Sequence, residues 1–312
     1  MGVGYRYSED TIYPTATFET VPTSDSQDLF SIFIQDEYRV NDAFRVTLGT
    51  KIEHNDYTDF EIQPTLRASW LASDTQTLWA AVSRAVRTPN RAENDMRLFI
   101  RPLPQVFNLP IPGVIFGNEY FESVEVIAYE LGYRNTIRSN LMFDIALFYN
   151  QYTNERNFDN DPSNTEPFPP GVIPLIVNND NDFDTNGVEF TIDYRPVDRW
   201  TIRTGYSYMN TNLDGGDTSN TPQQQASLTN QIQVTDEIQF DTTFRYTDQL
   251  PGLEDIDDYF TLDARLAWRP SDSLEMSLNG RNLFDDDQSE FIEFVANRLP
   301  TGVERSVYGQ IT

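Results

Sequence analysis

The feature that most constrains this chain is the alternation of short and long connections between segments of strand-like sequence. These segments have a two-residue period of apolar and polar residues and follow one another along all 312 residues. Short connections are expected at 41–42, 73–75, 138–140, 196–198, 236–237 and 271–273. Long connections are expected at 8–27, 88–122, 157–185, 211–222, 247–258 and 285–302. Because a transmembrane β-barrel carries tight turns on one rim and long loops on the other, this order favours a membrane barrel over a soluble sandwich.

The alternation assigns side chains to two faces, because successive side chains of a strand point to opposite sides of a sheet. Residues 260–269 show it most clearly. In this run we expect four side chains to face lipid, namely Phe260, Leu262, Leu266 and Trp268. We expect three to face a wet lumen, namely Asp263, Arg265 and Arg269. About fourteen runs of about 9–14 residues are long enough to cross a tilted bilayer. The predicted fold is therefore all-β, an antiparallel transmembrane β-barrel.

The aromatic residues are sorted between the two ends of the strands. All four tryptophans lie within a few residues of a short connection, namely Trp70, Trp79, Trp200 and Trp268. Several tyrosines lie toward the long connections, namely Tyr57, Tyr149, Tyr152, Tyr206, Tyr208, Tyr246 and Tyr259. Aromatic residues favour strands in any protein, but that preference does not explain the sorting of tryptophan. Two aromatic belts are typical of two membrane interfaces.

Composition excludes several classes of function. The formal net charge is −27, from 49 acidic and 22 basic residues, which argues against a nucleic-acid partner. The chain has no cysteine and one histidine, His54, for which we expect a structural role. It has no apolar run long enough for a transmembrane helix, no glycine-rich phosphate loop and no GxSxG or HExxH motif. We therefore predict neither an enzyme nor a cofactor or metal site.

One acidic segment has part of the spacing of a calcium loop. Asp180, Asp182 and Asp184 alternate as the oxygen ligands of such a loop do. However, Thr185 stands where the loop needs glycine, and Thr191 stands where it needs glutamate. Solvation of an exposed loop is the simpler interpretation of these charges.

One segment is basic against the acidic background. From residue 84 to residue 101, five arginines and two acids give a net charge of +3. We predict a ligand-binding set at the mouth of the pore, made of Arg84, Arg87, Arg91, Arg97, Arg101 and Tyr120. Guanidinium groups beside aromatic rings suit an anionic, partly aromatic ligand. Alternatively, these arginines pair with acids of neighbouring loops or with lipopolysaccharide phosphates. If they bind the ligand, replacing Arg91 and Arg97 by alanine should weaken the binding of an anionic ligand. The same replacements should leave stability nearly unchanged, because exposed ion pairs contribute only about 0–1 kcal/mol.

Several segments resemble strands of one family when they are taken in chain order. They are 33–38, 48–53, 78–89, 129–134, 186–190, 282–285 and 307–312. Together they are similar to the β-barrel of TonB-dependent outer-membrane receptors, over nearly the whole chain. The resemblance implies an outer-membrane location in a Gram-negative cell, with lipid, lipopolysaccharide and a small ligand such as a ferric siderophore as partners.

The resemblance also implies that residues 1–312 are part of a larger protein. Receptors of this family have a signal peptide, a TonB box, an N-terminal plug and a barrel of about 22 strands. On this view the chain is one barrel domain without plug or leader, and contact with the TonB complex would require the N-terminal parts. Residues 3–7 would pair with a strand outside the chain, or would close a smaller barrel against residues 307–312, because unpaired strand edges are costly in lipid.

Two functions follow from this reading. The first is an energy-coupled receptor and transporter for a scarce nutrient, a ferric siderophore above all, of which this chain is the barrel portion. The second is a complete small porin or fatty-acid-type channel of about fourteen strands. A soluble β-protein with a binding role is a third reading. The sequence does not identify the ligand, because recognition depends on how the long connections pack.

Overall fold

A computed structural model describes residues 1–100, 112–161, 171–213, 221–250, 256–284, 287–291 and 301–312. These residues form two compact units, which are described separately. The first comprises Met1–Ala68, Ala80–Tyr129 and Tyr149–Asp184, and the second comprises Ser69–Trp79, Glu130–Phe148 and Thr185–Thr312. Within these ranges, no helix is long and apolar enough to span a membrane.

Nineteen strands are described, and fourteen of them follow the predicted alternation. The fourteen are β1 (Gly2–Thr11), β3 (Ser24–Arg39), β4 (Phe44–Asn55), β5 (Asp59–Ser73), β6 (Gln76–Arg87), β9 (Val124–Arg138), β10 (Leu141–Asn160), β11 (Ile173–Val197), β12 (Trp200–Leu213), β13 (Gln224–Gln233), β14 (Ile238–Thr247), β15 (Tyr259–Ser271), β16 (Leu274–Arg281) and β19 (Ser306–Ile311). The other five lie within the long connections or at their edge, namely β2 (Phe18–Thr20), β7 (Met96–Ile100), β8 (Gly113–Phe116), β17 (Asp287–Phe291) and β18 (Thr301–Glu304).

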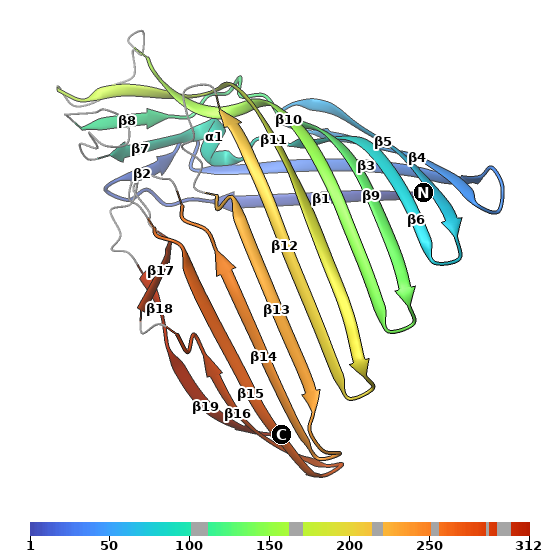
Figure 1. Ribbon diagram of the computed structural model, residues 1–312. Helices are drawn as coiled ribbons and strands as arrows, with labels where there is room; N and C mark the ends of the chain where they lie inside the picture. The colour runs from blue at the N-terminus through green and yellow to red at the C-terminus, as the bar shows by residue number, and fades with distance from the viewer. Residues whose placement is uncertain (101–111, 162–170, 214–220, 251–255, 285–286, 292–300) are drawn as a thin grey trace. The chain divides into compact units, whose positions relative to one another are not determined.

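Neighbouring strands in sequence pair antiparallel, as the short connections require. In the first unit β1 pairs with β3 and β3 with β4. In the second unit β12 to β16 form a continuous meander that ends with β19 (Figure 1). One parallel pair, β8 with β11, joins the small strands of the first unit to a long strand. The predicted short connections are confirmed, since each of the six falls between two consecutive paired strands.

The two faces of the strands differ as predicted. Phe260, Leu266 and Trp268 are 45–48% exposed, and Leu262 is half-buried, so none packs in a closed apolar interior. Side chains of the opposite phase pair with one another across β14, β15 and β16: Arg245 with Asp263, Arg265 with Asp241 and Glu275, and Arg269 with Glu275. The all-β fold with an exposed apolar face is therefore confirmed, whereas pairing between residues 3–7 and 307–312 stays a prediction.

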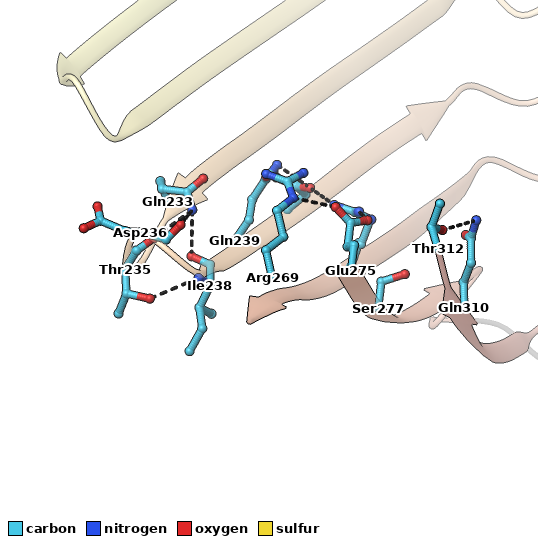
Figure 2. A network of polar contacts seen from close by, with 12 residues as sticks. Gln233, Thr235, Asp236, Ile238, Gln239, Arg269, Glu275, Ser277, Gln310 and Thr312 are labelled. Atoms are coloured by element: carbon cyan, nitrogen blue, oxygen red, sulfur yellow. Dashed lines mark hydrogen bonds and ion pairs between the residues drawn. The ribbon is translucent and has the colours of Figure 1, made fainter. Parts of the chain in front are cut away.

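Figure 2 shows this polar face at the tight-turn end of the second unit. Arg269 and Glu275 point toward each other, with Nε of Arg269 2.6 Å from a carboxylate oxygen. Gln233 donates to the carbonyl of Thr235, and the Thr235 hydroxyl accepts from the backbone N–H of Ile238, which satisfies polar groups of the β13–β14 turn. The turns at this end are therefore short and internally bonded.

The long connections are more structured than predicted. The sequence predicts a loop at 88–122, but this segment contains β7, β8 and the short helix α1 (Arg91–Asp95). The connections at 8–27 and 157–185 are also partly strand, because β2 lies in the first, while β10 and β11 extend into the second. The error arises because these strands either are too short to show a two-residue period or continue with polar residues on both faces.

An apolar core of buried residues lies in these connections. Its buried members come from three parts of the sequence, namely Met96, Ile100, Ile115, Phe121, Leu175 and Val177. We call β2, α1, β7 and β8, with the start of β11 and the residues that pack on them, the cap. Burying these side chains supplies the hydrophobic stabilisation that fixes the connections in one conformation.

Candidate functional site

The centre of the cap is the helix α1, and its first turn is closed by a capping box. The Asn90 side chain accepts hydrogen bonds from the N–H groups of Ala92 and Glu93. In return the Glu93 carboxylate accepts from the N–H of Asn90, at 3.1 Å. This reciprocal arrangement satisfies N–H groups that a helix start otherwise leaves unpaired. It fixes Glu93 inside the cap, where the residue is 1% exposed.

The buried Glu93 is paired with two arginines. Nη1 of Arg87 lies 2.9 Å from one carboxylate oxygen, and Nη1 of Arg156 lies 3.7 Å from the other. Both arginine side chains are nearly half exposed. A carboxylate that is removed from water needs such partners. The Arg87 side chain is thus held by Glu93 and stays partly accessible.

Arg91 is buried, which corrects the expectation that its replacement would leave stability unchanged. Its side chain is 7% exposed and donates to Asp10 and to the carbonyl of Pro22. Nε also lies 3.0 Å from Asp95, one turn further along α1. Burial raises the pKa of Asp95, and the Arg91 guanidinium opposes that rise. Arg91 therefore ties α1 to β1 and to the segment that follows β2.

The remaining predicted residues differ in their surroundings. Arg84 pairs with Glu125 and Glu61, and Arg97 lies opposite Glu19 across the β2–β7 pair with its guanidinium 6.0 Å from the ring centre of Phe116. Tyr120 is 79% exposed, and a hydrogen bond with Glu119 raises its pKa. Arg101 lies outside the described residues. The interpretation that these arginines pair with acids of neighbouring segments is confirmed for Arg84, Arg87, Arg91 and Arg97, and a role in ligand binding stays a prediction.

A pocket of about 410 Å³ lies beside Arg91 in the first unit. Its lining includes Arg6, Asp10, Asp28, Tyr57 and Arg91. Burial raises the pKa of the Tyr57 phenol to about 12. No signal in the sequence predicts this pocket, because its walls come from four segments that are distant in sequence and carry no common motif.

The acidic segment that resembled a calcium loop is extended. Asp180, Asp182 and Asp184 lie on β11, and each accepts a hydrogen bond from β10, from Asn157, Asn154 and Tyr149 respectively. An extended strand cannot wrap its carboxylates around one ion as a loop does. Across the described ranges no group of three or more His, Cys, Asp or Glu side chains is arranged to hold a metal. The calcium-loop interpretation is therefore wrong.

His54 has the surroundings of a structural residue. Its ring packs edge-on against Phe60, with 4.8 Å between the centroids. Nε2 lies 4.0 Å from the exposed carboxylate of Asp59. Neither contact orients a nucleophile or holds an ion.

The family profile described as TonB dependent receptor-like, beta-barrel matches residues 1–283. The chain belongs to the TonB-dependent receptor β-barrel family. It is therefore an outer-membrane protein that crosses the bilayer with β-strands. Known members of the family are receptors and transporters rather than enzymes.

Named relatives of this TonB-dependent receptor chain are distant in sequence. An iron-regulated outer membrane virulence protein of Vibrio cholerae is 22% identical over 193 residues, which are 61% of this chain and 28% of that protein. A crystal structure of the ferric enterobactin receptor PfeA of Pseudomonas aeruginosa has a TM-score of 0.75 at 18% identity, over 93% of this chain and 45% of that one. The siderophore receptor PirA of Acinetobacter baumannii has a TM-score of 0.74 at 16% identity, over 93% and 46% respectively.

These matches establish the fold. The chain spans less than half the length of these three relatives. Their identities are too low to carry over a ligand.

Proposed function

We propose that this chain is the barrel portion of an energy-coupled outer-membrane receptor that imports a ferric siderophore. The family match and the likeness to two siderophore receptors support the class of protein. The observation that carries the proposal is the folded cap. Its buried core fixes α1 and β7, so that Arg87 and Arg97 are displayed on a preformed surface. A preformed binding surface lowers the ordering cost of capturing a ligand at low concentration.

Within this proposal Arg87, Arg97 and Tyr120 are the ligand contacts. Arg87 pairs with Glu93 and Arg97 pairs with Glu19, and their side chains are 46% and 25% exposed respectively. Planar guanidinium groups bind anionic oxygens in pairs, and the phenol ring of Tyr120 adds an aromatic surface. Arg91 is assigned to holding the cap, because its three partners and its burial leave little of it for a ligand.

Growth under iron limitation tests the proposal. The full-length natural protein that contains this chain should restore growth of a receptor-deficient Gram-negative strain on a ferric siderophore. Uptake should saturate with concentration and stop when the proton gradient is collapsed. The 312-residue chain by itself should not restore growth, because energy coupling requires the plug and the TonB box.

Two variants sharpen this test. Replacing Arg87 and Arg97 by glutamine should raise the concentration of siderophore that gives half-maximal uptake, while Arg199→Gln, which alters an exposed pair with Asp236 in a tight turn, should not. Uptake that is linear in concentration and independent of the proton gradient would instead identify a passive porin-like channel. Saturable, energy-dependent uptake by the 312-residue chain alone would refute the assignment of this chain as the barrel portion of a coupled receptor.

A further inference from the structure

A second polar pocket lies in the other unit, at the tight turn between β9 and β10. Its volume is about 250 Å³, and its lining includes Arg138, Asn140, Asp193, Arg195, Thr201 and Arg203. Asn140 fixes this turn against β11, because its carbonyl accepts from the N–H of Arg195 at 2.8 Å and its side-chain amide donates to the carbonyl of Arg195 at 2.9 Å. The last residue of β9, Arg138, and Arg195 of β11 are thereby held on one rim.

The two arginines of this rim differ from the other arginines of their unit. Six arginines of the second unit pair with carboxylates, namely Arg134, Arg199, Arg203, Arg245, Arg265 and Arg269. A seventh, Arg281, lies over the ring of Tyr308 at 5.6 Å. In the described part of the chain, Arg138 and Arg195 have no carboxylate partner. Acids outnumber bases by 49 to 22 in this protein, so the lack of a partner does not reflect a shortage of acids.

The pocket opens on the polar face of the sheet. Arg203 pairs with Asp193 at 2.6 Å, and Thr201 shares the phase of Arg203 on β12. Trp200 belongs to the opposite phase, where its indole N–H donates to Asn230. Successive side chains of a strand alternate between faces, so the tryptophan faces the apolar side and the arginines face the wet side. A ligand of this pocket therefore comes from water rather than from the bilayer.

We propose that this pocket binds a phosphate-class oxyanion, either free phosphate or the phosphate group of a small soluble molecule. Arginine binds phosphate with two parallel N–H donors, and two guanidinium groups without a carboxylate partner provide the charge for a dianion. The hydroxyls of Thr136, Ser139 and Thr201 on the pocket lining add neutral donors. The volume is below the usual range of about 300–1,000 Å³ for sites of drug-sized ligands, so it suits one or two phosphate groups.

Phosphorus NMR on the full-length protein tests the proposal. Pyrophosphate is titrated with the protein in lipid-free maltoside micelles at constant ionic strength, and line broadening reports binding. We expect saturable binding, and a loss of affinity of about tenfold or more in the Arg138→Gln, Arg195→Gln double variant. The matched control is the Arg199→Gln, Arg245→Gln double variant, which removes the same charge from arginines that have carboxylate partners and should bind as the unaltered protein does.

The alternative outcomes are distinct. Equal loss in both double variants would show a general effect of net charge and would overturn the proposal, as would broadening that does not saturate. Binding that appears only after anionic phospholipid is added would assign the pocket to a lipid headgroup and would also overturn it. Comparing the unboiled and boiled forms of each variant on gels shows whether the variant is folded. A misfolded variant is replaced by the Arg138→Lys, Arg195→Lys double variant, which keeps the charge but removes the planar guanidinium groups. This lysine variant should bind pyrophosphate more weakly than the unaltered protein does.

Discussion

At the scale of single residues, the decisive observation is that an acidic chain buries one charge of each of several ion pairs in its cap. Glu93 is 1% exposed and Arg91 7% exposed, and each has more than one charged partner. The sequence shows only that two acids lie among five arginines in the segment from residue 84 to residue 101. Which arginine is structural and which is accessible depends on burial, which the local sequence does not encode.

Replacing Arg91 by glutamine should destabilise the cap by about 3–5 kcal/mol, because Asp95 and Asp10 would keep their charge without a partner. The Arg199→Gln variant of the exposed pair with Asp236 should cost only about 0–1 kcal/mol. Chemical denaturation, together with limited proteolysis of the 88–122 connection, measures the loss of stability in both variants. Equal stability of the two variants would contradict the buried role of Arg91.

The loss of stability in the Arg91→Gln variant should depend on pH. Burial already raises the pKa of Asp95, and removing Arg91 removes the charge that opposes this rise. A carboxyl group with a raised pKa in the folded state binds protons more readily when folded than when unfolded, so acidification favours folding. The difference in stability between the unaltered protein and the Arg91→Gln variant should therefore shrink as the pH falls through the raised pKa of Asp95.

At the scale of elements, the strand segments contain glycine where another strand approaches closely. A Cβ atom at Gly187 of β11 would lie 2.1 Å from the carbonyl oxygen of Tyr208, and one at Gly132 of β9 would lie 2.2 Å from the indole of Trp79. Both glycines belong to segments that resemble the family. Their physical role is to let neighbouring strands and a large ring pack without a clash.

Gly187→Ala should be clearly destabilising, because the obstructing atom belongs to the backbone and cannot rotate away. We expect the free energy of unfolding to fall by about 1–3 kcal/mol or more, as it does at other overpacked positions. Gly309→Ala on β19 is the matched control, because its nearest neighbour would be 3.9 Å from the new Cβ. The urea concentration that converts half of each variant to the unfolded form on unboiled gels reports the difference. Similar midpoints would show that the strands adjust at this site.

At the scale of the whole molecule, the order of connections relates each end of a strand to one side of the membrane. In outer-membrane barrels the tight turns lie at the periplasmic side and the long connections outside. The strands also exceed what a bilayer requires, since β10 has 20 residues and β11 has 25, whereas about 9–11 tilted residues suffice. The additional length serves the cap, because the first residues of β11 contribute Leu175 and Val177 to its core.

Cysteine labelling tests this topology directly, because the chain has no cysteine of its own. In intact cells a large polyethylene glycol maleimide should label Tyr120→Cys, whose parent side chain is highly exposed in a long connection. It should label Asp272→Cys, in the β15–β16 turn, only after the outer membrane is permeabilised. The reverse pattern would contradict the assigned orientation.

The sequence by itself determined the period of the fourteen long strands, the position of the tight turns between them and the exposure of the apolar face. These properties depend on residues close together in the sequence, because the two-residue period assigns each side chain of a strand to one face. The tertiary structure alone decided the cap, the burial of Arg91 and Glu93, the extension of β11 through Asp180, and both polar pockets. Those features join segments that are tens of residues apart, and a carboxylate or guanidinium has the same identity in the sequence whether it is solvated, buried in a pair or turned into a cavity.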